Sequence, residues 1–206
     1  MQDALMANWS AEPPVSGELQ ASLRDLNQRF LDLLAAGAAP ERGAPWPDLP
    51  RRIASLTSEQ KAAAANCPYA LFDLKFHDDA HWRGRLEQSA SGSIADSPAP
   101  AGTVAGFAQL ALFYAWHVAA NGALAAQLIL GMNERTAAAL SRVTLGRVAL
   151  LASAESGNLS ARWSGCNAFW AELIDAAARP DPKGLRRVQL FGLQLAAAAR
   201  LQHPAI

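Results

Sequence analysis

The stretch LILGMNERTAAALSRVTLGRVALLA, residues 128–152, sets the expectation for the whole fold. Gly131 is a typical helix stop, and Asn133, two residues later, is a typical cap for a new helix. Thr144 is a second cap, so two short helices are expected in close succession. Helices this short are stable only when they pack against others. The stretch therefore predicts a dense set of packed helices, suited to a catalytic site, a DNA-reading helix pair or a protein-binding face.

The composition extends this helical prediction to the rest of the chain. Of the 206 residues, 51% are hydrophobic, with Ala and Leu dominant and β-branched residues few. This is enough apolar material for a sizeable core, and the mixture favours helices over strands. The 18 basic and 18 acidic residues give a net charge of zero. No global field therefore attracts nucleic acid.

The cysteines and the N-terminus favour a cytoplasmic protein. Cys67 and Cys166 are the only cysteines, and neither belongs to a CxxC motif. Both are expected to be small buried hydrophobic side chains in a reducing compartment, and one disulfide in a secreted protein is the alternative. Residues 1–20 have neither the basic nor the apolar region of a signal peptide.

One segment has the length of a membrane span. Residues 107–130, FAQLALFYAWHVAANGALAAQLIL, carry no formal charge and are long enough to cross a bilayer. However, Gln109, His117 and Gln127 interrupt the segment, and Asn121-Gly122 is a turn signal in its middle. Two buried helices joined by an Asn-Gly turn are therefore expected, without membrane insertion.

The composition also divides the chain into segments. In the first part, an apolar stripe from Leu19 to Leu34 predicts a helix that Gly37 ends, and Thr57 with Gln60 forms a capping box. Prolines and small residues mark the breaks. The predicted organisation is an N-terminal arm (1–17), a first helical unit (18–88), a linker (89–102), a second helical unit (103–179) and a C-terminal helix (180–206).

The two helical units resemble each other in sequence. Leu56-Thr57 corresponds to Val143-Thr144, and Lys75-Phe76 corresponds to Arg162-Trp163 at the same spacing. After a one-residue insertion, Trp82 corresponds to Trp170. Shared alanine-rich composition is one explanation, and duplication is the other. We therefore expect an all-α fold in which two related units pack as an intramolecular pseudo-dimer, with a further C-terminal helix.

The second unit has a characteristic order of motifs. A Leu-Gly-apolar-Asn-Glu start at 130–134 leads through a leucine-rich stretch to Thr144-Leu145. An apolar helix and a turn ending in Arg162-Trp163 follow. This order resembles FlhD, a subunit of the flagellar master transcriptional activator, over residues 107–174 and more faintly over 51–88. The resemblance implies a helical, dimeric protein that activates promoters only together with a partner, which supplies most of the DNA contacts.

Two features depart from that family. The chain is nearly twice the family length, and Phe72 and Leu159 stand nearest to the position of the family's dimer cysteine. An intersubunit disulfide is therefore not expected. The long apolar helix pair followed by a capped, leucine-rich helix is also similar to small accessory proteins of the type III secretion sorting platform, although their N-terminal pattern is absent.

One cluster of residues has the composition of a catalytic or metal site. The heptad FHDDAHW (76–82) contains His77, Asp78, Asp79 and His81. On a helix the two histidines would share a face while the aspartates point elsewhere, and no second cluster supplies further ligands. A solvated turn in which Asp78 or Asp79 caps a helix is therefore the favoured interpretation.

Other catalytic and DNA-binding patterns are weak. GxSxG, P-loop and GxGxxG motifs are missing, so neither an enzyme nor a cofactor is expected. The helix-turn-like segment from Thr144 to Trp163 has only Arg142, Arg147 and Arg162 nearby as basic residues. Three arginines would give weak, salt-sensitive DNA binding, so DNA is expected to be contacted only weakly or through a partner.

The aromatic residues carry the functional prediction. They belong either to the core or to a pocket that anchors a protein partner, because Trp and Arg are typical hot-spot residues. The candidate partner-binding residues are Lys75, Phe76, Trp82, Arg162, Trp163, Phe169 and Trp170. The predicted function is that of a non-enzymatic cytoplasmic interaction protein, a transcription-regulatory subunit or modulator in a motility or secretion regulon. The alternative is an accessory protein of a type III secretion system. The chain itself is expected as a monomer or a homodimer.

Overall fold

A computed structural model describes residues 17–38, 47–90 and 103–202 of the chain. Over these residues it contains ten α-helices and two strands of two residues each, so the predicted all-α class is confirmed. The predicted N-terminal arm and linker lie outside the described residues, except that α1 begins at Gly17 and α4 continues to Ala90. The elements are α1 (Gly17–Ala35), α2 (Leu49–Ala54), α3 (Ser58–Ala65), β1 (Phe72–Asp73), α4 (Asp79–Ala90), α5 (Val104–Asn121), α6 (Ala123–Leu130), α7 (Glu134–Leu140), α8 (Leu145–Glu155), a 3₁₀ turn (Ser156–Asn158), β2 (Ser160–Ala161), α9 (Asn167–Ala178) and α10 (Pro182–Gln202).

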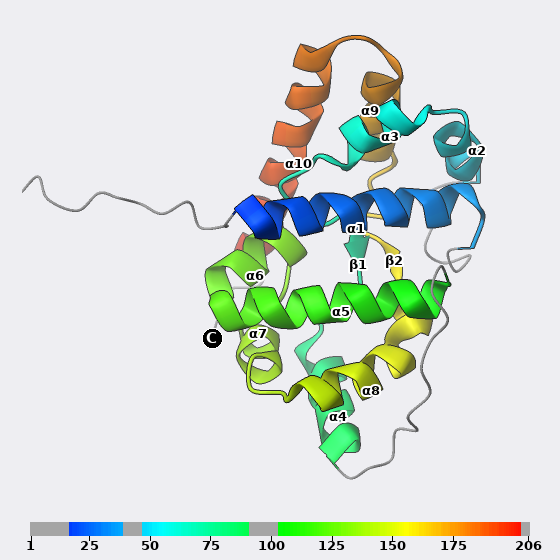
Figure 1. The fold of residues 1–206 in the computed structure, drawn as a ribbon. Helices are drawn as coiled ribbons and strands as arrows, with labels where there is room; N and C mark the ends of the chain where they lie inside the picture. The colour runs from blue at the N-terminus through cyan, green and yellow to red at the C-terminus, as the bar shows by residue number, and fades with distance from the viewer. Residues whose placement is uncertain (1–16, 39–46, 91–102, 203–206) are drawn as a thin grey trace, which may run out of the picture.

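Two long helices, α1 and α5, lie side by side across the middle of the molecule (Figure 1). They run in opposite directions, because Tyr114 late in α5 donates a hydrogen bond to the Leu19 carbonyl early in α1 at 3.2 Å. At the other end of the pair, the rings of Phe30 and Phe107 lie 5.7 Å apart. The predicted apolar stripe of α1 faces this core: Leu23, for example, is fully buried.

The short strands join the two halves of the chain behind this helix pair (Figure 1). They are antiparallel, with Phe72 opposite Ala161 and Asp73 opposite Ser160. The buried Asn27 of α1 supports the extended segment that leads into β1. Its amide donates to the Ala65 and Tyr69 carbonyls at 3.1 and 2.9 Å and accepts from the Leu71 N–H at 2.8 Å. A buried amide with three partners costs little stability, and here it fixes the path of residues 65–71.

The halves also exchange helices across the central pair. Helix α4 from the first half packs against α7 and α8 of the second half, and α9 packs against α2 and α3 of the first half. Figure 1 shows α2, α3 and α9 on one side of the α1–α5 pair and α4, α7 and α8 on the other. Arg52 of α2 pairs with Asp175 of α9, and Gln60 donates to the Ala178 carbonyl at 3.0 Å. Neither half therefore buries its own faces alone.

The local signals in the sequence define the helix ends. Thr57 and Gln60 form the predicted capping box at α3, and the predicted Asn-Gly turn separates α5 from α6. Gly131 ends α6 in the left-handed conformation at φ 68°, and the Asn133 side chain caps α7. Thr144 occupies the N-cap position of α8 without a side-chain hydrogen bond to the helix. Of the described helices, none combines the length and the apolar character that crossing a membrane requires.

Helix α10 covers one end of the molecule, where it packs on α9 and α6. It extends from Pro182 to Gln202, within the segment 180–206 that was predicted as the C-terminal helix. A glycine at position 192 permits close contact with Tyr69: a Cβ there would lie 1.9 Å from the tyrosine Oη. The Tyr69 hydroxyl in turn donates to the Gln189 carbonyl at 3.1 Å. Together these contacts hold α10 against the first half of the chain.

Candidate functional site

Most of the predicted partner-binding residues lie inside the protein. Phe76, Phe169 and Trp170 are fully buried, and Trp82 is 1% exposed. These four aromatic side chains are part of the core, and a side chain that is already packed has no area left to bury against a partner. In this structure they are therefore not available for contact with a partner. Of the seven candidates, Lys75 is exposed and Trp163 is partly buried.

Arg162, the remaining candidate, is a buried cation. It is 6% exposed, donates to the Ile129 carbonyl at 2.7 Å and stacks on the Trp163 ring at 4.6 Å. Burial lowers the pKa of Arg162 to about 10, an effect that the charge of Asp73 partly opposes. The guanidinium stays charged at neutral pH, and its hydrogen bond connects the residue that follows β2 to the end of α6. It is withdrawn as a partner contact for the same reason as the aromatic residues.

Each short strand is followed by the same unusual turn. Lys75 and Trp163 have φ values of 56° and 53°, in the left-handed region that few non-glycine residues adopt. Three residues later, the Asp78 and Cys166 N–H groups donate to the Lys75 and Trp163 carbonyls. Lys75 therefore corresponds to Trp163, and the predicted register, which placed it on Arg162, is wrong by one residue in this turn. The left-handed residues and the starts of α4 and α9 are all separated by 88 residues. The one extra residue of the second half therefore lies before β2.

A tryptophan side chain forms a hydrogen bond with the backbone at each turn. The Trp82 indole N–H donates to the Lys75 carbonyl at 3.1 Å, and the Trp170 indole N–H donates to the Arg162 carbonyl at 2.9 Å. A buried indole needs a partner for its single donor. In both places that partner is a backbone carbonyl of the left-handed turn, so the tryptophans stabilise turn geometry.

The histidine-aspartate cluster is a helix cap. Asp78 accepts a hydrogen bond from the His81 N–H at 2.9 Å, and this bond lowers the pKa of Asp78. His77 points to Asp73, and their hydrogen bond raises the pKa of His77. The two histidines therefore have different partners. No group of His, Cys, Asp or Glu within the described segments has the arrangement of a metal site.

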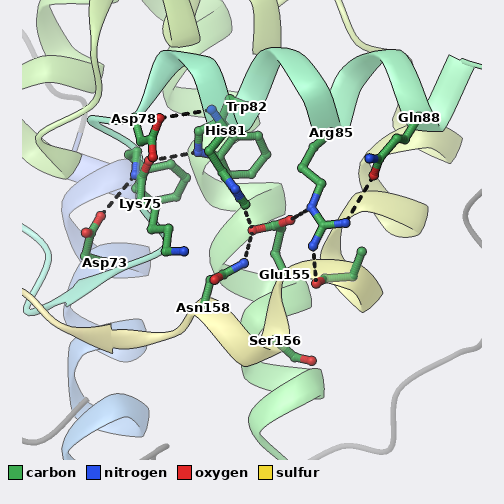
Figure 2. A network of polar contacts seen from close by, with 12 residues as sticks. Asp73, Lys75, Asp78, His81, Trp82, Arg85, Gln88, Glu155, Ser156 and Asn158 are labelled. Atoms are coloured by element: carbon green, nitrogen blue, oxygen red, sulfur yellow. Dashed lines mark hydrogen bonds and ion pairs between the residues drawn. The ribbon is translucent and has the colours of Figure 1, made fainter. Parts of the chain in front are cut away.

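The main polar feature of the interior is a network around Glu155 at the end of α8 (Figure 2). This carboxylate is fully buried. Its Oε2 lies 2.7 Å from His81 Nε2 and accepts from the Asn158 amide at 2.8 Å. Its Oε1 lies 2.7 Å from Arg85 Nε, an ion-pair contact whose angle is not that of a hydrogen bond. Glu155 therefore joins two residues of α4 to the end of α8.

Nearby contacts extend this junction along α4. Arg147 of α8 donates to the Leu86 carbonyl at 2.7 Å and to Ser89 Oγ at 2.8 Å, near the C-terminal end of α4. Arg147 is one of the three arginines considered for weak DNA contact, and in the structure it binds the last turn of α4 through one carbonyl and one hydroxyl. With Arg162 buried and Arg147 half-buried, Arg142 is the one exposed member of that set of three.

An open groove lies between α1 and α5. It has a volume of about 380 Å³. Its side is formed by Leu110, Phe113 and Tyr114, and Leu110 is 46% exposed. Its lining also includes Glu18 and His117 and is completed by Leu19, Ser22 and Leu26. The sequence contained one signal for this surface, because α5 and α6 have no charged residue. The structure shows that several side chains of these two helices nevertheless reach solvent.

The two cysteines are free. Cys67 is fully buried, as predicted, and burial raises the pKa of its thiol to about 12. Cys166 is only partly buried, so the prediction that both thiols are buried is wrong for this residue. Comparison of the chain with protein-family models, with curated proteins and with solved structures gives no match.

Proposed function

We propose that this chain is a non-enzymatic protein-interaction protein whose two halves form an intramolecular pseudo-dimer. Equivalent helices, exchanged reciprocally, support the pseudo-dimer: α4 and α9 both have 12 residues, and both strands lead into a left-handed residue. The observation that carries the interaction function is the half-exposed groove between α1 and α5, whose lining contains a single acid, Glu18, and no Lys or Arg.

The proposed occupant of the groove is one amphipathic helix of a protein partner. Interface centres are poor in charged residues and rich in aromatic ones, and the α5 side of the groove has both properties. A helix that lies in such a groove inserts side chains spaced three and four residues apart. Glu18 at the rim, which accepts no hydrogen bond from a described residue, favours a basic residue at one end of that helix.

The narrower role follows from the resemblance to FlhD. We propose a cytoplasmic regulatory subunit or modulator that acts on transcription through its partner, with DNA contacted only weakly or indirectly. The buried or engaged positions of Arg147 and Arg162 favour this indirect mode. An accessory role in a type III secretion system is the second candidate, and the identity of the partner distinguishes the two.

Site-specific crosslinking in the native cell tests the proposal. A photoreactive amino acid replaces Leu110 in the full chain, and the matched control replaces Leu145, a leucine of α8 that is 57% exposed. We expect a discrete adduct from position 110 alone, formed with an amphipathic helix of another protein. A DNA-binding regulator as the partner supports the regulatory role, and a secretion component supports the alternative.

Other outcomes contradict the proposal. An adduct with a second copy of this chain would make the groove a homodimer contact. Identical adducts from positions 110 and 145 would mean that exposed leucines are trapped indiscriminately. In either case the groove is not the docking site for a partner helix.

A further inference from the structure

Helix α10 presents a continuous exposed stripe on the side away from the protein. Lys183, Arg186, Arg187, Leu190 and Gln194 are all exposed, and their spacing places them on one face of the helix. The opposite face, which contains the buried Val188 and Ala196, packs on the protein. The stripe is therefore a property of the folded helix and is separate from the face that holds it in place.

The start of the stripe is strongly basic in an otherwise neutral protein. Arg179, Lys183, Arg186 and Arg187 lie within nine residues of each other, and Asp181 is the one acid among them. Asp181 is already engaged, because its side chain accepts from the Lys183 N–H at 3.1 Å. No carboxylate of the described residues forms an ion pair with any of the four cations. By contrast, the exposed Arg29 and Arg83 both pair with an aspartate one turn away, at 2.8 Å.

The stripe changes character at its second half. No charged residue occurs from Val188 to Ala199. Leu190 is 52% exposed and is followed on the same face by Gln194, Ala197 and Ala198. A large exposed leucine between a basic turn and small uncharged residues gives a helix surface that is complementary to another helix: small residues permit close approach, and the leucine supplies the anchor.

We propose that this stripe, Lys183 to Ala198, binds an acidic amphipathic helix of a protein partner. Acidic side chains of the partner pair with Lys183, Arg186 and Arg187, and its apolar face covers Leu190 and the alanines. A second copy of α10 does not fit, because α10 contains no acid. Phosphates of a nucleic acid would satisfy the cations and leave the uncharged half of the stripe unused. This surface is distinct from the α1–α5 groove, and the two proposals fail independently.

A designed peptide tests the proposal on the full chain. The probe is a fluorescent helix of about 18 residues, long enough to fold on contact, with leucines on one face and glutamates flanking it at one end. A scrambled peptide of the same composition, a short DNA duplex and phosphatidylglycerol vesicles are the comparison probes. Binding is measured by anisotropy for the peptides and the DNA and by sedimentation for the vesicles.

Three variants assign the binding to the stripe. R186E/R187E is expected to weaken peptide binding about tenfold, because two attractive pairs become repulsive. L190S is expected to weaken it about fivefold through lost apolar contact. R24E/R142E changes the net charge equally at two exposed arginines elsewhere and should change affinity less than about twofold. The groove variant L110R should also leave it unchanged.

Each remaining outcome overturns the proposal. Failure of the amphipathic peptide to bind would do so, as would equal binding of the scrambled peptide. Equal losses in R186E/R187E and R24E/R142E would reduce the effect to net charge. Tighter binding of DNA or vesicles than of the peptide would assign the cations to phosphate.

Discussion

Replacing Glu155 by glutamine tests the central claim about how the halves are joined. The substitution preserves the size of the side chain and removes its charge. Glu155 has three close partners, at 2.7 Å from His81, 2.7 Å from Arg85 and 2.8 Å from Asn158. All three present N–H groups or a nitrogen to the carboxylate. The amide of glutamine has one acceptor oxygen, so its NH₂ group must face a donor.

The size of the effect follows from burial. Removing one member of a fully buried ion pair costs about 3–5 kcal/mol. Glu155 is fully buried, but the Arg85 side chain is 29% exposed and His81 is 17% exposed, so both recover some hydration. We therefore expect a loss of about 2–3 kcal/mol in the free energy of unfolding. For a chain of this length, that corresponds to a decrease in Tm of about 5–10 °C.

Urea unfolding followed by circular dichroism at pH 7 measures this loss. The matched control is D25N, which also converts an acid to an amide but breaks an exposed pair with Arg29, where the side chains are 61% and 56% exposed. Its expected effect is below about 0.5 kcal/mol. A double variant with Glu155→Leu and Arg85→Met should lose less stability than E155Q, because no unpaired charge remains at the junction.

A result for E155Q within about 0.5 kcal/mol of the wild type would refute the reasoning, since that is the range of surface substitutions. An equal loss in the double variant would also count against it. The junction would then depend on the volume of these side chains, and the charge of Glu155 would contribute nothing.

Three further predictions concern other parts of the fold. G192A should destabilise the protein by about 2 kcal/mol or more through overlap with the buried tyrosine, whereas G146A, in an open helical position, should be neutral or stabilising; urea unfolding compares them. In the folded protein, a thiol reagent at pH 8 should label Cys166 and spare Cys67, whose pKa is raised to about 12 by burial, and denaturant should expose both. D78A should cost about 1 kcal/mol at pH 7 through loss of the helix cap. Because the pKa of Asp78 is lowered in the fold, its stabilising contribution is present above the unfolded pKa and is lost as the pH falls through the folded pKa. The difference in unfolding free energy between the wild type and D78A should therefore be larger at pH 7 than at pH 2.

Local features of this fold could be predicted from the sequence because they depend on neighbouring residues. The capping box at Thr57, the turn at Gly122 and the left-handed stop at Gly131 are all where the pattern indicated. Each is a backbone requirement that one or two residues satisfy on their own. The spacing of leucines in α1 likewise predicted its buried face, because a helix needs one continuous apolar side to pack.

The predicted site could not be corrected from the sequence, because burial is decided by distant segments. Trp82 and Trp170 are consistent with an exposed anchor until the left-handed turns that accept their indole N–H groups are known. Glu155 gave no signal at all: a single acid after an apolar helix is usually solvated. Its partners on α4 are about seventy residues away in sequence, and only the exchange of helices brings them together.

The comparison of the two ends of the molecule gives a reason for the extra helix. At matching positions, spaced by 88 residues, His81 and Arg85 on α4 correspond to Phe169 and Leu173 on α9. The α4 end is polar: the buried carboxylate of Glu155 pairs with His81 and Arg85, and the Arg85 side chain remains partly exposed to water. The α9 end is apolar: Phe169 is fully buried against Tyr69 and Phe191, the latter from α10.

An apolar end needs a cover, and a polar end does not. On the proposal that the halves are duplicates, the difference between α4 and α9 at these two matching positions therefore explains why the α9 end needs α10 as a cover. The same divergence predicts an asymmetry in function. The end covered by α10 presents the basic stripe of that helix, whereas the other end presents the α4–α8 junction, whose charges are largely paired within the protein. A partner attracted by charge should therefore bind at the α10 end, and deletion of residues 180–206 should abolish its binding while also exposing Phe169.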